Sequence, residues 1–150
     1  MVGRENDRSH GRYELLRAAY RNDVARASRL IAGGADVNRK DSTEQSAYLI
    51  ATSEVGDDPR LLDLTLAAGA DVHSLDSFNG TGLIRAADRG YPAIVRRLLR
   101  TDIRVDHVNN LGWTALHEAV VLGDGSRRYL DTVRVLVAAG ADVDVVSPRT

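Results

Sequence analysis

Apolar residues along this chain follow two patterns, and both fit helices. In one kind of segment the recurring apolar residues are small: Ala18, Ala19, Ala51, Ala86, Ala87 and Ala119. In the other kind they are large and follow helical spacing, as in Leu61, Leu62, Leu66 and in Ile94, Val95, Leu98, Leu99. Such a stripe buries one face of a helix, and small residues let a neighbouring helix approach closely. The pattern predicts an all-α chain built from helix pairs.

The helix pairs repeat along the chain. The segment LIAGGADVN at residues 30–38 returns as LAAGADVH at 66–73 and as LVAAGADVD at 136–144, with a weaker copy, LLRTDIRVD, at 98–106. Before the last three copies stands a second motif, which reads STEQSAYLIAT, SFNGTGLIRAA and NLGWTALHEAV in turn. The equivalent positions are 35, 33 and 38 residues apart and are Gly34, Gly69, Asp102 and Gly140. Self-similarity at a nearly fixed period predicts stacked repeats.

This pattern resembles the ankyrin repeat, a unit of about 33 residues with a β-turn followed by two helices. The resemblance implies an all-α solenoid of about four helix-turn-helix repeats joined by β-turn or hairpin loops. We place the repeats at about 13–40, 41–75, 76–108 and 109–146, within an ankyrin domain of residues 13–150. Residues 1–12 are interpreted as a flexible N-terminal arm.

Three stretches are similar to those of a group of short bacterial ankyrin proteins. They read EQSAYLI, LTLAAGADVHS and LGWTALHEAVVLGDG. In that group a further repeat follows, so we expect this chain to stop before a repeat that completes the domain. The helix YLDTVRVLVAAG at residues 129–140 shows no polar outer face, although a terminal repeat needs one for solubility. We therefore expect an apolar surface there, covered by a fifth repeat, a partner or a second copy through self-association.

The stretch GWTALHEAV holds the residues that most suggest chemistry. Thr114 and His117 match a nucleophile and a base, but they also occupy the T and H of the ankyrin T-P-L-H motif. No carboxylate is spaced to orient His117, and no polar loop supplies an oxyanion hole, so the structural interpretation is favoured. With no cysteine and four scattered histidines, we expect no catalytic residues, no metal and no cofactor.

Two departures from the pattern predict local irregularity. Glu44 stands where the turn glycine is expected in the second repeat, and Glu tolerates the left-handed region poorly. The third repeat has Asp102 in place of the glycine that follows the second helix, so its loop should deviate. Insertions at about 53–59 and 122–131 should emerge at one edge of the stack without disturbing it.

Charge and hydropathy narrow the choice of partner. The formal net charge is −1, which gives no general attraction to nucleic acid or membranes. No apolar run is long enough for a membrane span and no secretory signal is visible, so we expect a cytoplasmic protein. An alternative is an anionic partner such as nucleic acid, held by the arginines of the third repeat: Arg85, Arg89, Arg96, Arg97, Arg100 and Arg104. A solvated helix face explains them better, and few aromatic residues lie among them.

The favoured function is a non-catalytic scaffold or regulator that binds an unidentified protein through the concave face of hairpins and first helices. Position within the repeat selects ten candidate residues: Ser42, Thr43, Gln45, Phe78, Asp88, Arg89, Asn110, Leu111, Trp113 and Leu122. Phe78 and Leu111 are 33 residues apart and should occupy the same place on adjacent hairpins, with Trp113 beside them. Together these three predict an apolar binding patch. The alternative, that Trp113 only packs on its own hairpin, stays open.

Overall fold

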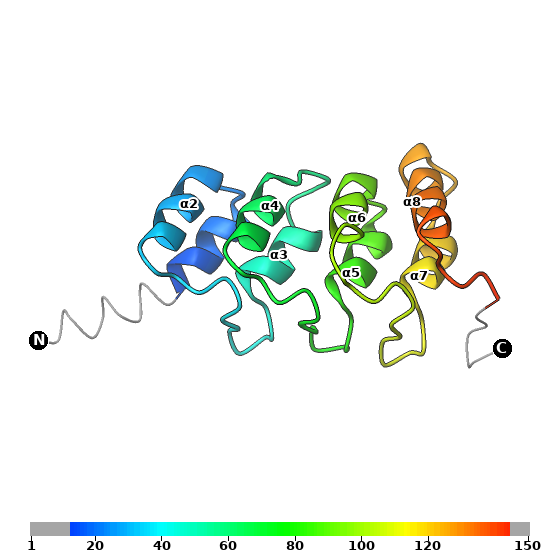
Figure 1. Cartoon of the computed structure of the whole chain (residues 1–150), viewed down its shortest axis with the longest axis horizontal. Coiled ribbons are helices and arrows are strands. Elements are labelled where there is room, and N and C mark those ends of the chain that lie inside the picture. Colours follow the sequence, from blue (N-terminus) through cyan, green and yellow to red (C-terminus); the bar gives the residue numbers. More distant parts are fainter. Residues whose placement is uncertain (1–12, 145–150) are drawn as a thin grey trace, which may run out of the picture.

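A computed structural model describes residues 13–144, and they form a row of stacked helix pairs (Figure 1). After helical residues 13–20 the helices are α2 (Val24–Ala32), α3 (Ala47–Ser53), α4 (Arg60–Ala67), α5 (Gly82–Arg89), α6 (Pro92–Leu98), α7 (Ala115–Leu122) and α8 (Arg127–Ala138). No strand occurs in the described part of the chain, so the predicted all-α solenoid is confirmed. The predicted arm at residues 1–12 lies outside the described residues, as does 145–150.

The first helix of each later repeat begins with the same cap. The hydroxyls of Ser46, Thr81 and Thr114 accept a hydrogen bond from the backbone N–H three residues on, at 3.1, 3.3 and 3.2 Å. In α7 the cap is reciprocal, because the Thr114 N–H donates to Nδ1 of His117 at 3.2 Å. This capping box occupies the two groups that had suggested a nucleophile and base, which supports their structural interpretation.

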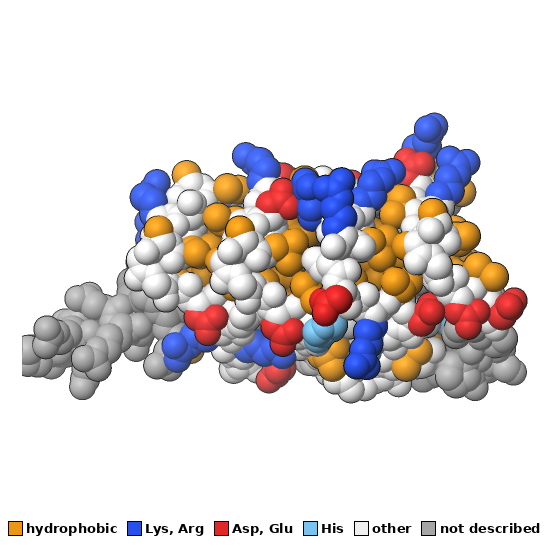
Figure 2. Space-filling model, viewed as in Figure 1, with side chains coloured by type: hydrophobic (Ala, Val, Ile, Leu, Met, Phe, Trp, Pro, Cys, Tyr) orange, Lys and Arg blue, Asp and Glu red, His pale blue; other side chains and the backbone are white. Residues whose placement is uncertain are grey.

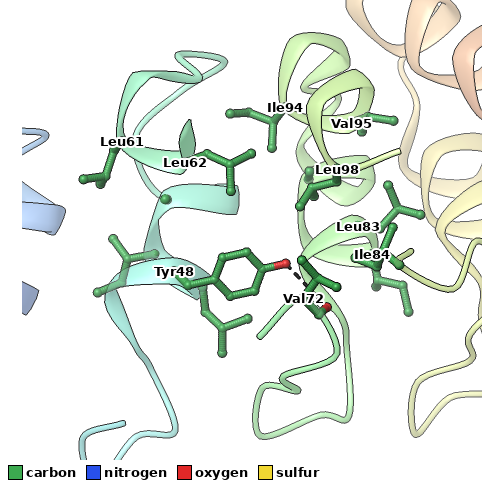
Figure 3. Close-up of a cluster of buried hydrophobic side chains, with 14 of the residues drawn as sticks. Tyr48, Leu61, Leu62, Val72, Leu83, Ile84, Ile94, Val95 and Leu98 are labelled. Atoms are coloured by element: carbon green, nitrogen blue, oxygen red, sulfur yellow. Dashed lines mark hydrogen bonds between the residues drawn. The ribbon is translucent and has the colours of Figure 1, made fainter. Parts of the chain in front are cut away.

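The core lies between neighbouring repeats, where first helices pack on first helices and second on second. Helix α5 contacts both α3 and α7, and α6 contacts α8. Figure 3 shows Tyr48 of α3 reaching toward Val72, whose carbonyl accepts a hydrogen bond from its hydroxyl at 3.5 Å. At Gly82 an added Cβ would lie 2.8 Å from both the Tyr48 hydroxyl and Thr52 Cγ2, so only glycine fits at this close approach.

Three second helices end alike, and the third repeat departs as predicted. In the regular form the residue after the helix-ending glycine donates back into the last turn, for example from Ala70 to the Thr65 carbonyl at 3.0 Å, and the glycine has a left-handed φ of 91° to 105°. Asp102 has no such backbone conformation. There the Thr101 hydroxyl donates to the Leu98 carbonyl at 2.5 Å and accepts from the Ile103 N–H at 3.2 Å, which replaces the glycine cap.

The insertion near 53–59 links repeats instead of only projecting from the stack. Its Asp57 carboxylate accepts from the N–H groups of Ala93 and Ile94 at 3.1 and 3.0 Å, which caps the start of α6 in the next repeat. Its Asp58 carboxylate accepts from Nδ2 of Asn22 in the preceding repeat at 2.9 Å. Two adjacent carboxylates thus tie three consecutive repeats together at one edge.

Candidate functional site

The inner face of the stack, defined here as the first helices and the hairpin turns before them, carries the candidate residues. The hairpins project from one edge of the row (Figure 1). Each begins with Asp41, Asp76 or Asn109, whose side-chain oxygen accepts the N–H groups two and four residues ahead at 2.8 to 3.1 Å. Each is closed by a backbone bond of 2.9 or 3.0 Å. Three hairpins therefore present equivalent positions in the same geometry.

The expectation of an irregular first hairpin was wrong. Glu44 adopts a left-handed φ of 65°, close to the 58° of Asn79 and the 78° of Gly112 at the same place in the later hairpins. The reason is that the Asp41 carboxylate accepts hydrogen bonds from the Thr43 N–H, the Thr43 hydroxyl and the Gln45 N–H, which fixes the turn and thereby imposes the backbone conformation on Glu44. The strain falls on a single exposed residue and leaves the hairpin regular.

Hydrogen bonds also join one hairpin to the next. The Asn110 N–H donates to the Phe78 carbonyl at 2.9 Å, and Nδ2 of Asn79 donates to Oδ1 of Asn110 at 2.6 Å. Between the first two hairpins, Nζ of Lys40 donates to the Leu75 carbonyl at 2.6 Å. These bonds fix the tips relative to each other, so side chains on adjacent tips face a partner as one surface.

Between the second and third repeats the inner face is closed by a cluster that we call the arginine network. It consists of Arg85 with Gln45, Thr52, Glu54 and Asp76. The guanidinium of Arg85 donates to Oδ2 of Asp76 at 3.1 Å, to Oε1 of Gln45 at 2.9 Å and to the Thr52 hydroxyl at 3.3 Å. The side chains of Arg85 and Asp76 are only 10% and 11% exposed.

Between the third and fourth repeats the same face is open. A groove of about 350 Å³, which we call the aromatic groove, runs between the two hairpins and the helices α5 and α7. Its apolar lining comprises Phe78, Ile84, Leu111, Trp113 and Leu122. The Phe78 side chain is 71% exposed, and Leu111 and Leu122 are also exposed, whereas Trp113 is half-buried. Exposed large apolar side chains gathered around a concavity are typical of a binding site.

Carboxylates line the floor of the aromatic groove. Asp88 and Glu118 both contribute to it, and Glu118 is only 7% exposed. Burial raises the pKa of Asp88, and the positive charges of Arg89 and Arg85 offset this only in part. Burial and the negative charge of Asp88 raise the pKa of Glu118, against the hydrogen bond that Oε1 accepts from Asn109 Nδ2 at 2.9 Å. The groove thus combines apolar walls with two carboxyl groups that are costly to ionise.

The structure brings half of the ten predicted residues into this one groove. Phe78, Leu111, Trp113, Leu122 and Asp88 line it together. Of the rest, Gln45 belongs to the arginine network, and Asn110 links two hairpins. Arg89 is exposed, with its guanidinium 3.7 Å from Glu54. Ser42 and Thr43 lie exposed on the first hairpin.

Sequence reasoning missed Ile84, Glu118 and the residues that shape the hairpins. Glu118 falls within the motif GWTALHEAV, at the same place in α7 that Arg85 occupies in α5. A comparison of those two positions could have identified Glu118, because a cation in one repeat and an anion at the equivalent position of the next indicate that the two repeats differ locally.

The arginine-rich third repeat is not one basic surface. Arg85 points into the arginine network, Arg97 pairs with Asp63 at 2.8 Å, and Arg89 lies near Glu54. The exposed Arg96, Arg100 and Arg104 remain. On the face seen in Figure 2, basic side chains lie along the upper edge over the second helices, and others lie along the lower edge near the hairpins. Paired or dispersed charges of this kind are weak evidence for nucleic-acid binding.

Large apolar side chains are exposed on the last repeat. In α8 the side chains of Leu130 and Val137 are exposed, Leu136 is buried, and Val133 and Val135 are half-buried. Val120 of α7 is also exposed. These positions fit the expected apolar surface at this end, but what covers it remains a prediction.

Among residues 13–144, no group of three His, Cys, Asp or Glu side chains is placed to hold a metal ion. In the same range no helix combines the length and apolar character needed to cross a bilayer.

The architecture defines the chain as a tandem repeat protein of stacked helix pairs with turns along one edge. A family model of ankyrin repeats, three copies long, matches residues 49–147. The ankyrin repeat protein YahD of Escherichia coli is 36% identical over 132 residues, which cover 87% of this chain and 65% of YahD. The chain belongs to the ankyrin repeat family.

Two more proteins are similar to this chain. The mitochondrial disaggregase of Bos taurus is 33% identical over 132 residues, which cover 85% of this chain but 18% of that protein. A crystal structure of an ankyrin repeat domain from Acinetobacter baumannii matches with a TM-score of 0.83 and 42% identity, over 90% of this chain and 68% of that one. The chain therefore spans about two thirds or less of the two curated relatives. Ankyrin repeats are generally protein-interaction modules and are typically non-catalytic.

Proposed function

We propose that this chain is a non-catalytic scaffold or regulator that binds a protein partner through its inner face. The aromatic groove is the anchor of that interaction. The observation that carries the proposal is the cluster formed by Phe78, Leu111 and Trp113, three large apolar side chains from adjacent hairpins that line one concavity. Aromatic residues in a central concavity dominate binding energy in protein interfaces.

The rigidity of the hairpins supports this role. The tips are fixed by the Asp76 and Asn109 turns and by the bond from the Asn110 N–H to the Phe78 carbonyl. A preformed surface loses little conformational entropy on binding, which favours affinity. The remaining predicted contacts, Ser42, Thr43 and Arg89, lie farther along the same face and form its polar surroundings.

The site is tested by truncating the aromatic groove and measuring stability and binding separately. The Phe78→Ala variant should keep the free energy of unfolding within about 0.5 kcal/mol, because the ring is 71% exposed. The same variant should weaken partner binding by about 2 kcal/mol. Trp113→Ala should weaken binding as well, with a loss of stability that reflects its partial burial.

The measurements are urea denaturation of each variant and calorimetric titration with the partner recovered from the native host. Val108→Ala is the control, since it removes an exposed apolar side chain that lies outside the aromatic groove and outside the apolar surface of the last repeat. Full partner binding by both groove variants would mean that the patch is structural and the proposed site is wrong.

A further inference from the structure

The charges of the inner face are not balanced from one repeat to the next. In the arginine network the Asp76 carboxylate pairs with Arg85 at 3.1 Å, and Glu54 lies 3.8 Å from the same guanidinium. Arg85 also lines the aromatic groove, but its guanidinium is already bonded to Asp76 and Gln45. Among residues 13–144, no group hydrogen-bonds or ion-pairs with the Asp88 carboxylate, and Glu118 accepts its hydrogen bond from the neutral amide of Asn109.

Resting on the proposed function, we propose that the aromatic groove receives a basic side chain, Arg or Lys, from an extended segment of the partner. The Asp88 and Glu118 carboxylates bind its charged end, and the apolar walls contact its methylene stem and its neighbours. Both features belong to the same concavity, so one side chain with an apolar stem and a cationic end satisfies both. The aromatic rings of Phe78 and Trp113 add attraction for a cation through their faces.

The burial of the two carboxylates determines how strongly the groove prefers a cationic side chain, and their negative charge determines that the preference is for a cation. Glu118 is 7% exposed, and a charge in such a place interacts more strongly with an incoming ion than an exposed one does. Leaving two neighbouring carboxylates in a concavity costs stability, as the raised pKa of each shows. An arriving cation relieves that cost, whereas an acidic side chain increases it. A neutral side chain leaves it unchanged.

The probe is a set of short synthetic peptides with random apolar residues around one fixed central residue. The central residue is Arg, Lys, citrulline, Gln or Glu. Citrulline has nearly the shape of Arg without its charge, so the comparison isolates the charge. Binding to the full chain is followed by calorimetry and by the fluorescence of Trp113, the one tryptophan of the sequence, which lies in the groove itself.

The Arg and Lys peptides should bind, with citrulline peptides about tenfold weaker and Glu peptides weaker still. Asp88→Asn combined with Glu118→Gln should remove the preference for Arg over citrulline. The control is Asp102→Asn, which removes one negative charge from an exposed position of the third repeat outside the aromatic groove and should keep that preference.

The outcomes separate this inference from the proposed function. Peptides that bind, lose affinity with Phe78→Ala, yet show no preference for Arg over citrulline would overturn the basic occupant and leave the groove as the binding site. A preference that survives in the Asp88→Asn, Glu118→Gln variant would also overturn it. Absence of binding by every peptide, or binding unaffected by Phe78→Ala, would overturn both.

Discussion

The arginine network and the aromatic groove occupy equivalent places in successive repeats, yet one is filled and the other is open. Arg85 is the fourth residue of α5, and Glu118 is the fourth residue of α7. Arg85 spans from its own hairpin to that of the preceding repeat by binding Asp76 and Gln45. Glu118 accepts a hydrogen bond from Asn109 of its own hairpin, the one side-chain partner it has among residues 13–144. The same backbone arrangement therefore serves two roles. The side chain at the fourth position of the first helix decides whether the space between two repeats is filled by an ion-pair network or left open.

The difference follows from the chemistry of the two side chains. Arg carries five N–H donors in a planar fork on a long stem, so it can satisfy acceptors from two repeats at once. Glu is shorter and, when ionised, only accepts. Among residues 13–144 no cation forms an ion pair with Glu118, and the apolar residues at the rim of the groove are exposed.

The largest expected effect comes from removing the centre of the arginine network. Arg85→Met should lower the free energy of unfolding by about 3 kcal/mol, because it leaves the 11%-exposed Asp76 carboxylate without its cation. Urea denaturation measures the loss. Arg89→Met is the control, since its side chain is 51% exposed and should contribute under about 1 kcal/mol. Equal losses in both variants would show that the network is no more structural than a surface ion pair.

Removing the groove carboxyl groups should have a smaller effect, and it should raise the free energy of unfolding at neutral pH. Because burial raises the pKa of Asp88 and Glu118 in the folded state, the folded chain holds these protons more tightly than the unfolded chain. Their contribution to stability is therefore present below the unfolded pKa and is lost as pH rises through the folded pKa. The Asp88→Asn, Glu118→Gln variant should be more stable than the parent at neutral pH, by under about 1 kcal/mol since solvent still reaches Asp88.

The test is the free energy of unfolding of parent and variant as a function of pH. The charged or titratable groups that face the two carboxyls are Arg85, Arg89, Asp76 and His117, and the variant retains all of them. The stability difference should shrink as the solution is acidified and both carboxyls protonate. A variant that is less stable than its parent at neutral pH would contradict a strained pair of carboxylates.

The smallest effect concerns the one irregular residue of the hairpins. Glu44→Gly should raise the free energy of unfolding by about 0.5 kcal/mol, because glycine adopts the φ of 65° without steric cost. The greater entropy of glycine in the unfolded state offsets part of this gain. Gly112→Ala, at the equivalent place, should lower it by about 1 kcal/mol. Thermal or urea denaturation measures both changes. If both substitutions shifted stability in the same direction, the equivalence of the hairpins would be wrong.

The fold was predictable from the sequence because the same local sequence features recur in each repeat. The Thr114 cap, the glycines after the second helices and the aliphatic stripes all depend on residues close together in the chain. The site was predictable only where the period maps one position onto the next, as it does for Phe78 and Leu111. Contacts between repeats, such as Asp57 with α6 or Arg85 with Gln45, depend on side-chain reach, which spacing does not encode.

The fixed hairpin tips determine the spacing of side chains that a bound segment can use. The bonds from Lys40 to Leu75 and from Asn110 to Phe78 hold neighbouring tips in fixed positions, so equivalent residues recur at a regular spacing along the stack. Helices in contact lie about 10 Å apart, and a chain in the polyproline II conformation advances about 3.1 Å per residue with three residues per turn. A segment in this conformation that runs along the stack therefore presents roughly every third side chain to an equivalent position. Three successive positions of this kind are occupied by Thr43, Phe78 and Leu111.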